Sequence, residues 1–173
     1  MNHNGLEIER KYLIRMPDEK QLKDMPCCEI WDIVQTYLMD GEDMSTHRVR
    51  SIATGGSVQY IHTIKHRLSQ LSHREWEEEV SEQEYLRLLE GANPGLKPIE
   101  KRRYRIPYAG QILEVDIYSF WQDRATLEIE LESEEQQVIL PEWISIVRDV
   151  TGEVPYKNRY LAEKVPMEEL EHE

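Results

Sequence analysis

Residues 6–13 read LEIERKYL, a run in which charged and apolar residues alternate. Successive side chains of a β-strand point to opposite faces, so Glu7, Glu9 and Lys11 are predicted to share one face of a strand. The other face is apolar and is expected to pack against the rest of the protein. Taken alone, a charged strand face is more often solvated than bound to a ligand.

The same alternation recurs in seven further segments of the chain. These segments are residues 33–39, 46–52, 58–66, 74–80, 100–108, 112–118 and 126–132. Eight strands are enough to close a barrel, and turn-forming residues at 54–57 and 109–110 predict antiparallel hairpins. The predicted fold is α+β, a closed eight-stranded antiparallel β-barrel with a charged interior and helices packed on the outside.

Several sequence signals predict helices between and after these strands. Pro17 suits the first turn of a short helix. Capping-box sequences occur at residues 81–84 (SEQE) and 133–136 (SEEQ). The spacing of apolar residues predicts an amphipathic helix over residues 143–152, and another helix is expected over 156–164.

The bulk properties of the chain limit what it can bind and where it acts. The 173 residues suit one domain, 1–173, with an acidic C-terminal tail at about 167–173. No apolar run reaches the ~18 residues of a membrane span, and the first residues carry no secretory pattern, so we expect a cytoplasmic protein without membrane contact. The net charge of −13 would repel nucleic acid. Cys27 and Cys28 are adjacent and are expected to be reduced.

Charges of like sign stand two residues apart on several of the predicted strands. These pairs are Arg48/Arg50, Lys101/Arg103, Glu75/Glu77, Glu114/Asp116 and Glu128/Glu130. Like charges at roughly 7 Å repel unless a partner compensates them. An ordinary sandwich with solvated charged faces is compatible with the alternation, but a barrel with the charges inside satisfies every pair.

The charges predicted to line the interior suggest both a metal and a phosphate chain. The acids are Glu7, Glu9, Glu75, Glu77, Glu114, Asp116, Glu128 and Glu130, and the bases are Lys11, Arg48, Arg50, Lys65, Lys101 and Arg103. Carboxylates are preferred ligands of Mg²⁺ and Mn²⁺. The bases suit phosphate oxygens.

The segment at residues 6–13 resembles the signature of the CYTH superfamily, whose members are also called triphosphate tunnel metalloenzymes. The resemblance continues along the chain in the order of the compact bacterial members. The further matching segments are 63–65 (TIK), 75–77 (EWE), 100–104 (EKRRY), 114–116 (EVD), 128–130 (EIE) and 156–158 (YKN). Six further segments in family order make a chance match improbable.

The resemblance implies an eight-stranded tunnel that uses Mg²⁺ or Mn²⁺ to act on triphosphates. The implied phosphate-binding residues are Lys11, Arg48, Arg50, Lys65, Lys101, Arg103 and Lys157. The implied metal ligands are Glu7, Glu9, Asp116, Glu128 and Glu130, with Glu75, Glu77 and Glu114 binding metal or water. The candidate catalytic residues are Glu9, Glu130 and Lys101. Glu9 and Glu130 remain alternatives for orienting the water, and Lys157 is either a tunnel residue or a surface lysine.

The expected function is a divalent-metal-dependent triphosphatase (an acid anhydride hydrolase), with inorganic triphosphate as the first substrate. Alternatives on the same fold are a thiamine triphosphatase, a nucleoside triphosphatase and a class IV type adenylate cyclase. A polyphosphate- or nucleotide-binding module without turnover is a further alternative. The four tryptophans are expected to pack, and nothing in the sequence selects one of them to stack an organic group. The oligomeric state is left open, with a homodimer as one option.

Overall fold

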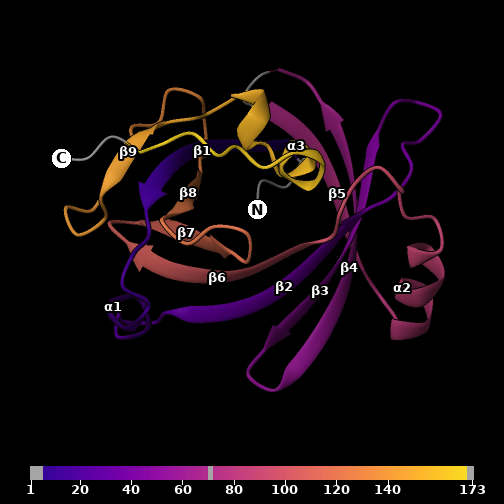
Figure 1. Cartoon of the computed structure of the whole chain (residues 1–173), viewed down its shortest axis with the longest axis horizontal. Coiled ribbons are helices and arrows are strands. Elements are labelled where there is room, and N and C mark those ends of the chain that lie inside the picture. Colours follow the sequence, from indigo (N-terminus) through magenta and orange to yellow (C-terminus); the bar gives the residue numbers. More distant parts are fainter. Residues whose placement is uncertain (1–5, 70–71, 171–173) are drawn as a thin grey trace.

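The computed structural model describes residues 6–69 and 72–170. Nine strands form one antiparallel sheet in the order β5-β4-β3-β2-β6-β7-β8-β1-β9 (Figure 1). The strands are β1 (Leu6–Arg15), β2 (Glu29–Tyr37), β3 (Thr46–Thr54), β4 (Ser57–Arg67), β5 (Ser72–Val80), β6 (Ile99–Tyr108), β7 (Gln111–Tyr118), β8 (Arg124–Glu130) and β9 (Ile146–Asp149). The α+β class and the eight predicted strand segments are confirmed.

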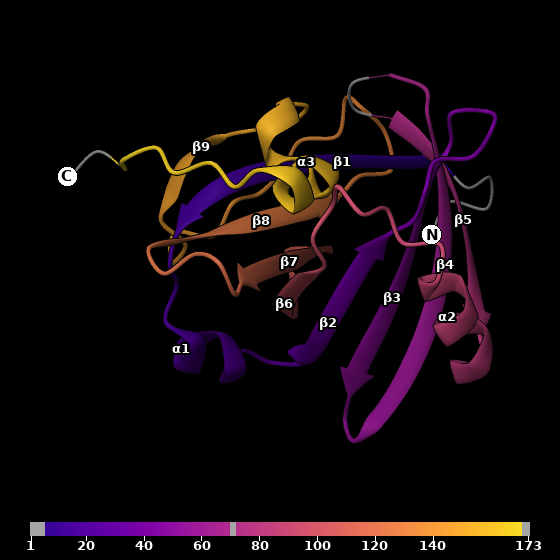
Figure 2. The same ribbon diagram turned by 45° about the vertical axis from the view of Figure 1, so that its right-hand side comes forward.

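Strand β1 is central to the sheet because it pairs with three other strands. It pairs with β8 along one edge over Glu9–Arg15. Along the other edge, Leu6–Ile8 pair with Ser72–Arg74 of β5, and Tyr12–Ile14 pair with β9. The sheet therefore curves so that its first strand in sequence lies next to β5, as Figure 2 also shows.

The ninth strand overturns the prediction of an amphipathic helix over residues 143–152. Ile146 packs with one hydrophobic cluster, whereas Val147 packs with a second. Neighbouring side chains thus point to opposite faces, as they do in a strand. The apolar spacing was compatible with a helix, but the open edge of β1 provides hydrogen-bond partners that a helix would not use.

Three helices and one 3₁₀ turn complete the fold of the described residues. They are α1 (Glu19–Lys23), α2 (Glu82–Leu89), the 3₁₀ turn η1 (Val154–Tyr156) and α3 (Asn158–Glu163). The Ser81 hydroxyl caps α2 by accepting from the amide of Glu84 at 3.1 Å, as the capping box predicts. Asp18 caps α1, so Pro17 precedes the helix and does not lie in its first turn.

The second capping-box sequence, at residues 133–136, does not begin a helix. The amide of Gln136 donates to the carbonyl of Ser133 at 3.2 Å, and the Gln136 side chain accepts from the amide of Glu132 at 2.6 Å. The segment is a turn whose polar side chains bind the backbone locally. Within the described ranges, no helix is long and apolar enough to cross a membrane.

Apolar and charged residues separate onto the two faces of the sheet. The largest hydrophobic cluster covers the outer face of β1 and β6–β8, where Leu22 of α1 packs against it, and α2 packs on β3 and β4 through Tyr85. The buried charged residues of the inner face include Lys11, Arg50, Lys101, Arg103, Asp116 and Glu128. The charges therefore face inward, as predicted, and the sandwich with solvated charged faces is excluded.

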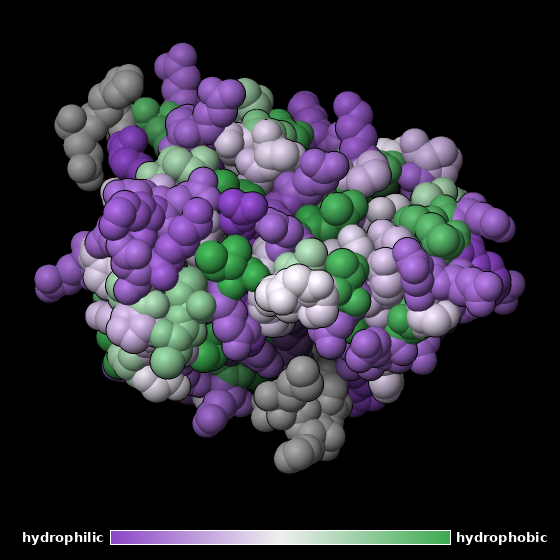
Figure 3. All heavy atoms as spheres, turned by 90° about the horizontal axis from the view of Figure 1, so that it is seen from below, coloured by the Kyte–Doolittle hydropathy of each residue, from purple (hydrophilic) through white to green (hydrophobic). Residues whose placement is uncertain are grey.

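The inner face is not charged along its whole length. At one end, Leu13, Tyr37 and Tyr118 form an apolar cluster with Tyr156 of η1 and Leu161 of α3. Thus η1 and α3 lie against the inner face, while α1 and α2 pack on the outside. The molecular face in Figure 3 is largely hydrophilic with scattered hydrophobic residues. Cys27 and Cys28 are free, as expected.

Candidate active site

A cavity of about 490 Å³ lies on the charged inner face of the sheet and is called the central cavity here. Its lining includes twelve of the predicted site residues, namely Glu7, Glu9, Arg48, Arg50, Lys65, Glu75, Glu77, Lys101, Arg103, Glu114, Glu128 and Glu130. Lys11 and Lys157 instead line a smaller cavity of about 230 Å³ beside η1 and α3, the α3-side cavity. Asp116 is fully buried behind the wall.

One wall of the central cavity, formed by β3, β4 and β5, carries a cluster of ion pairs. The register of these strands sets Lys65 opposite Glu75 and Thr63 opposite Glu77. Lys65 Nζ lies 3.0 Å from Glu75 Oε1 and 2.7 Å from Glu7 Oε2. Glu77 Oε1 accepts from Arg50 Nη2 at 2.6 Å and from Thr63 Oγ1 at 3.0 Å.

The opposite wall, formed by β6, β7 and β8, carries a second and more deeply buried cluster. Arg103 donates to Asp116 from Nε at 2.6 Å and from Nη2 at 2.8 Å, and to Glu128 at 3.0 Å. Lys101 Nζ donates to Asp116 Oδ2 at 2.6 Å. Lys11 reaches Glu128 from β1 at 2.9 Å. Period 2 places these side chains on the inner faces of neighbouring strands.

For each group of this second cluster, burial shifts the pKa in one direction and ion pairing shifts it in the other. Burial alone would raise the pKa of Asp116, but Arg103 and Lys101 hold it below its usual value. Burial lowers the pKa of Lys101 to about 8, although Asp116 acts against this shift. Lys101 thus loses its proton far closer to neutral pH than an ordinary lysine.

The first strand places one charged residue in each cluster and one between them. Glu7 pairs with Lys65 on one wall, and Lys11 pairs with Glu128 on the other. Glu9 lies between them, and burial together with the nearby Glu128 carboxylate raises its pKa. Among the described residues, no hydrogen bond or ion pair engages its carboxylate.

The position of Glu130 increases the negative charge at Glu9. The two residues are direct cross-strand partners of β1 and β8. Like charges in this position destabilise a sheet. Within the described chain, the Glu130 carboxylate also has no side-chain partner. An opposed pair of unpaired carboxylates is therefore suited to a hard divalent cation.

The predicted metal ligands are thus divided into two groups. Glu7, Asp116 and Glu128 have oxygens engaged by lysine or arginine, whereas no described lysine or arginine engages Glu9 or Glu130. In the part of the chain that the structure describes, no three His, Cys, Asp or Glu side chains converge as a cation site. Mg²⁺ is often bound by only one or two carboxylates together with substrate phosphates, and this donor set fits that mode.

Two of the guanidinium groups contain buried donors that lack an acceptor. Arg48 Nε and Arg50 Nε are buried without a hydrogen-bond partner among the described residues. Buried donors of this kind normally have a partner. An oxyanion bound in the cavity would provide one.

The structure adds site residues that the sequence did not single out. Trp31 and Arg105 line the central cavity, and Arg67 and Arg159 line the α3-side cavity. Trp31, Arg67 and Arg105 continue the alternation of inward-facing residues along their strands, so the sequence contained a signal for all three. Trp31 and Arg67 were missed because the predicted strands began at residue 33 and ended at residue 66. Arg159 follows β9 and has no such signal.

Comparison with known proteins identifies the fold. No protein-family model and no curated protein sequence matches the chain. The inorganic triphosphatase NE1496 superposes with a TM-score of 0.57 and 28% identity, over 93% of this chain and 97% of that one. The chain has the CYTH fold.

A structure of lower sequence identity shares the same fold. PH1819 from Pyrococcus horikoshii has a TM-score of 0.56 at 17% identity, over 74% of this chain and 80% of that one. At this identity the likeness concerns the fold alone. The likeness to NE1496 confirms, at the level of structure, the resemblance of residues 6–13 to the CYTH signature.

Proposed function

We propose that this protein hydrolyses triphosphates with the help of a divalent cation, and that inorganic triphosphate is its substrate. The observation that carries the proposal is the combination of inward-facing bases with two unpaired carboxylates. Within the described residues, Arg48 and Arg50 have buried donors without acceptors, and Glu9 faces Glu130. A phosphate chain with a bound cation satisfies both groups at once. The likeness to NE1496 supports the same substrate.

In this proposal the bases bind and neutralise the phosphate chain. Arg48, Arg50 and Lys65 approach it from one wall, and Lys101 and Arg103 approach it from the other. Catalysis of phosphoryl transfer consists mainly of such positioning and charge stabilisation. The β1–β5 pairing supports a tunnel that encloses the chain on all sides.

We assign the orientation of the attacking water to Glu9, which also shares the cation with Glu130. Glu9 is half-buried, and its raised pKa makes the carboxylate a better proton acceptor. Glu130 is exposed at the rim. Lys101 has a pKa of about 8, so it is able to give a proton to the departing pyrophosphate near neutral pH.

The cation expected here is Mg²⁺ or Mn²⁺, held by Glu9 and Glu130. The chemistry that it supplies is neutralisation of charge on the phosphoryl oxygens. Glu9 and Glu130 are cross-strand partners, and a cation held between their carboxylates would relieve the repulsion between them.

One observation favours organic triphosphates as second candidates. Trp31 lines the central cavity with the Arg105 guanidinium 4.5 Å from its ring centre, and its indole nitrogen donates to Glu29 at 3.2 Å. A fixed aromatic surface at the cavity wall suits a heteroaromatic group. Thiamine triphosphate and nucleoside triphosphates therefore belong in the same screen.

The deciding screen measures orthophosphate release from tripolyphosphate, thiamine triphosphate and ATP, each with Mg²⁺ and with Mn²⁺. Cyclic AMP is measured in parallel. We expect metal-dependent release that is fastest with tripolyphosphate. Tight binding of tripolyphosphate by calorimetry without phosphate release would establish a binding module instead. Turnover of ATP or thiamine triphosphate alone would contradict the assigned substrate.

A further inference from the structure

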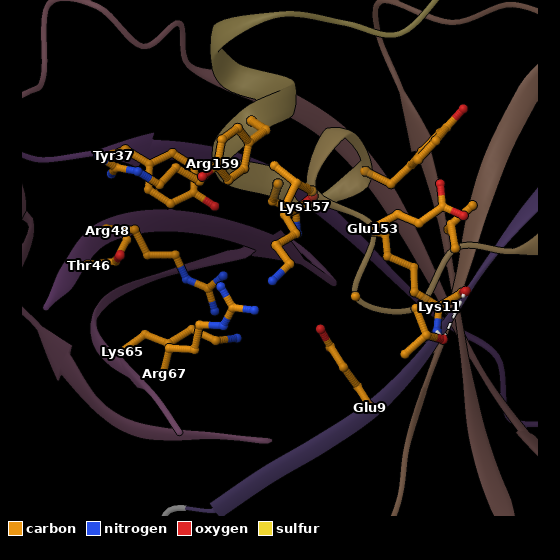
Figure 4. Close-up of a pocket in the computed structure, with 17 residues that line it drawn as sticks. Glu9, Lys11, Tyr37, Thr46, Arg48, Lys65, Arg67, Glu153, Lys157 and Arg159 are labelled. Atoms are coloured by element: carbon orange, nitrogen blue, oxygen red, sulfur yellow. Dashed lines mark hydrogen bonds between the residues drawn. The ribbon is translucent and has the colours of Figure 1, made fainter. Parts of the chain in front are cut away.

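Two histidines face each other on the outer face of β3 and β4, which is opposite the two cavities. Thr46 and Arg48 line the α3-side cavity, and Figure 4 shows Arg48 pointing into it. His47 lies between them in β3 and therefore points to the other face. His62 shares that outer face, because its cross-strand partner is Val49, which packs under α2. The two rings approach each other with Nδ1 of His47 3.4 Å from Nε2 of His62.

The hydrogen bonds around His47 leave the nitrogen that faces His62 without a proton. The Ser45 hydroxyl donates its one hydrogen to Asp43 Oδ1 at 2.5 Å, since a carboxylate only accepts. Toward His47 the same hydroxyl must accept, so the ring proton is assigned to Nε2, 2.9 Å away. Burial and the neighbouring His62 lower the pKa of His47, which favours the neutral ring. A neutral imidazole has one N–H, so Nδ1 presents a lone pair.

The partner of His62 leads to the same result for the second ring. Nδ1 of His62 lies 3.4 Å from Glu78 Oε1 on β5. The carboxylate accepts the ring proton from Nδ1, so Nε2 presents its lone pair to His47. Two lone pairs that face each other repel until a cation lies between them. Glu84 of α2 also interacts electrostatically with His62 and adds negative charge there.

A direct hydrogen bond between the two rings accounts for the contact less well. The separation of 3.4 Å is longer than the ~2.9–3.0 Å that is typical of bonds from N–H donors. Such a bond would also require one ring to gain a proton or to give up its bond to Ser45 or Glu78. The arrangement of both rings therefore fits a bound cation better than a shared proton.

We propose that His47 and His62 bind one divalent transition-metal ion, such as Zn²⁺, between Nδ1 of the first ring and Nε2 of the second. Tetrahedral Zn–N bonds of ~2.0–2.1 Å hold two ligand nitrogens about 3.3–3.4 Å apart, and the two rings already have this separation. Imidazole is a preferred ligand of such metals. Water completes the coordination, because in the described chain no third His, Cys, Asp or Glu side chain converges there.

The partners on the far side of each ring have the role expected around such a metal. Histidine ligands commonly donate their second N–H to a carboxylate or another oxygen, which fixes the tautomer and the ring orientation. Ser45 has this position for His47, and Glu78 has it for His62. The site joins β3 to β4 on the outer face and is independent of the proposed triphosphatase function.

The test measures Zn²⁺ binding by isothermal titration calorimetry with Mg²⁺ in excess. Mg²⁺ occupies carboxylate sites such as those of the central cavity, and it competes weakly for imidazole. His47→Gln and His62→Gln each remove one ligand. His66→Gln is the matched control, since His66 is a half-buried histidine on the same face of β4 whose Nε2 lies 3.5 Å from Asp43. Thermal unfolding of each metal-free variant verifies that it folds.

We expect one Zn²⁺ binding event in the wild type and in His66→Gln, and its loss in His47→Gln and in His62→Gln. Ser45→Ala should weaken this event by about 10- to 100-fold, the range for a lost outer partner of a ligand. Binding that persists in both ligand variants, that is lost equally in His66→Gln, or that is absent from the wild type would overturn the site. Tripolyphosphate hydrolysis with Mg²⁺ should be unchanged in His62→Gln. A protein without hydrolysis would refute the proposed function, and the calorimetry would still test the histidine pair.

Discussion

Replacing Asp116 by asparagine tests whether the buried ion cluster stabilises the fold. The Asp116 side chain is 0% exposed and forms the ion pair of Lys101, whose own side chain is 1% exposed. Arg103 keeps Glu114 and Glu128 after the substitution. Lys101 is left without an ion-pair partner in the described chain. A buried charge that loses its partner costs about 3–5 kcal/mol.

The assay is urea denaturation, supported by thermal unfolding. For a chain of this length, each kcal/mol lowers Tm by about 2–4 °C, so a decrease of about 6–20 °C is expected. The penalty should shrink as pH rises, because Lys101 has a pKa of about 8 and needs no partner once neutral. The control is Asp32→Asn, whose exposed carboxylate binds Arg102 at 2.7 and 3.3 Å and whose loss should cost at most about 1 kcal/mol. Equal effects of the two substitutions would refute the reasoning.

Three further predictions concern stability. Burial raises the pKa of Glu75, but Arg48 and Lys65 together lower it to about 2. The contribution of Glu75 to the free energy of unfolding is therefore present above pH 4.5 and is lost as the pH falls toward 2. Glu75→Gln should therefore reduce the loss of stability between pH 4.5 and 2, measured by urea denaturation at several pH values. Gly41→Ala should cost about 1–3 kcal/mol in the same assay, since the new Cβ would lie 2.6 Å from Ser45 Oγ. Ser81→Ala should cost about 1 kcal/mol, and Ser133→Ala at most about 0.5 kcal/mol, by thermal unfolding.

The inward orientation of the charges could be predicted because it follows from local sequence. Like-charge pairs two residues apart, such as Glu128 and Glu130, indicate that the pair faces an interior where opposite charges compensate it. This holds whatever the strand order is. The partner of each charge could not be predicted, because it depends on which strands are neighbours. Glu128 was therefore predicted to be a metal ligand, whereas the structure shows it paired with Lys11 and Arg103.

The sequence also failed where apolar residues satisfy two patterns at once. In β9, Ile146 and Val147 pack on different clusters, and their spacing suits a helix as well as a strand. Arg67 was missed for a simpler reason, because strand ends are the least certain part of a pattern. The isolation of Glu9 has no sequence signal, since it results from Lys65 and Lys11 being paired elsewhere.

Substitution of Glu9 by glutamine tests the central claim most directly. Because Glu9 has no hydrogen-bond or ion-pair partner among the described residues and is repelled by nearby carboxylates, Glu9→Gln should leave the metal-free protein at least as stable as the wild type. Hydrolysis of tripolyphosphate with Mg²⁺ should nevertheless fall by about 10²- to 10⁴-fold, the range for a lost catalytic base. Glu132→Gln, outside the central cavity, should hydrolyse at the wild-type rate. Undiminished hydrolysis by Glu9→Gln would contradict the account.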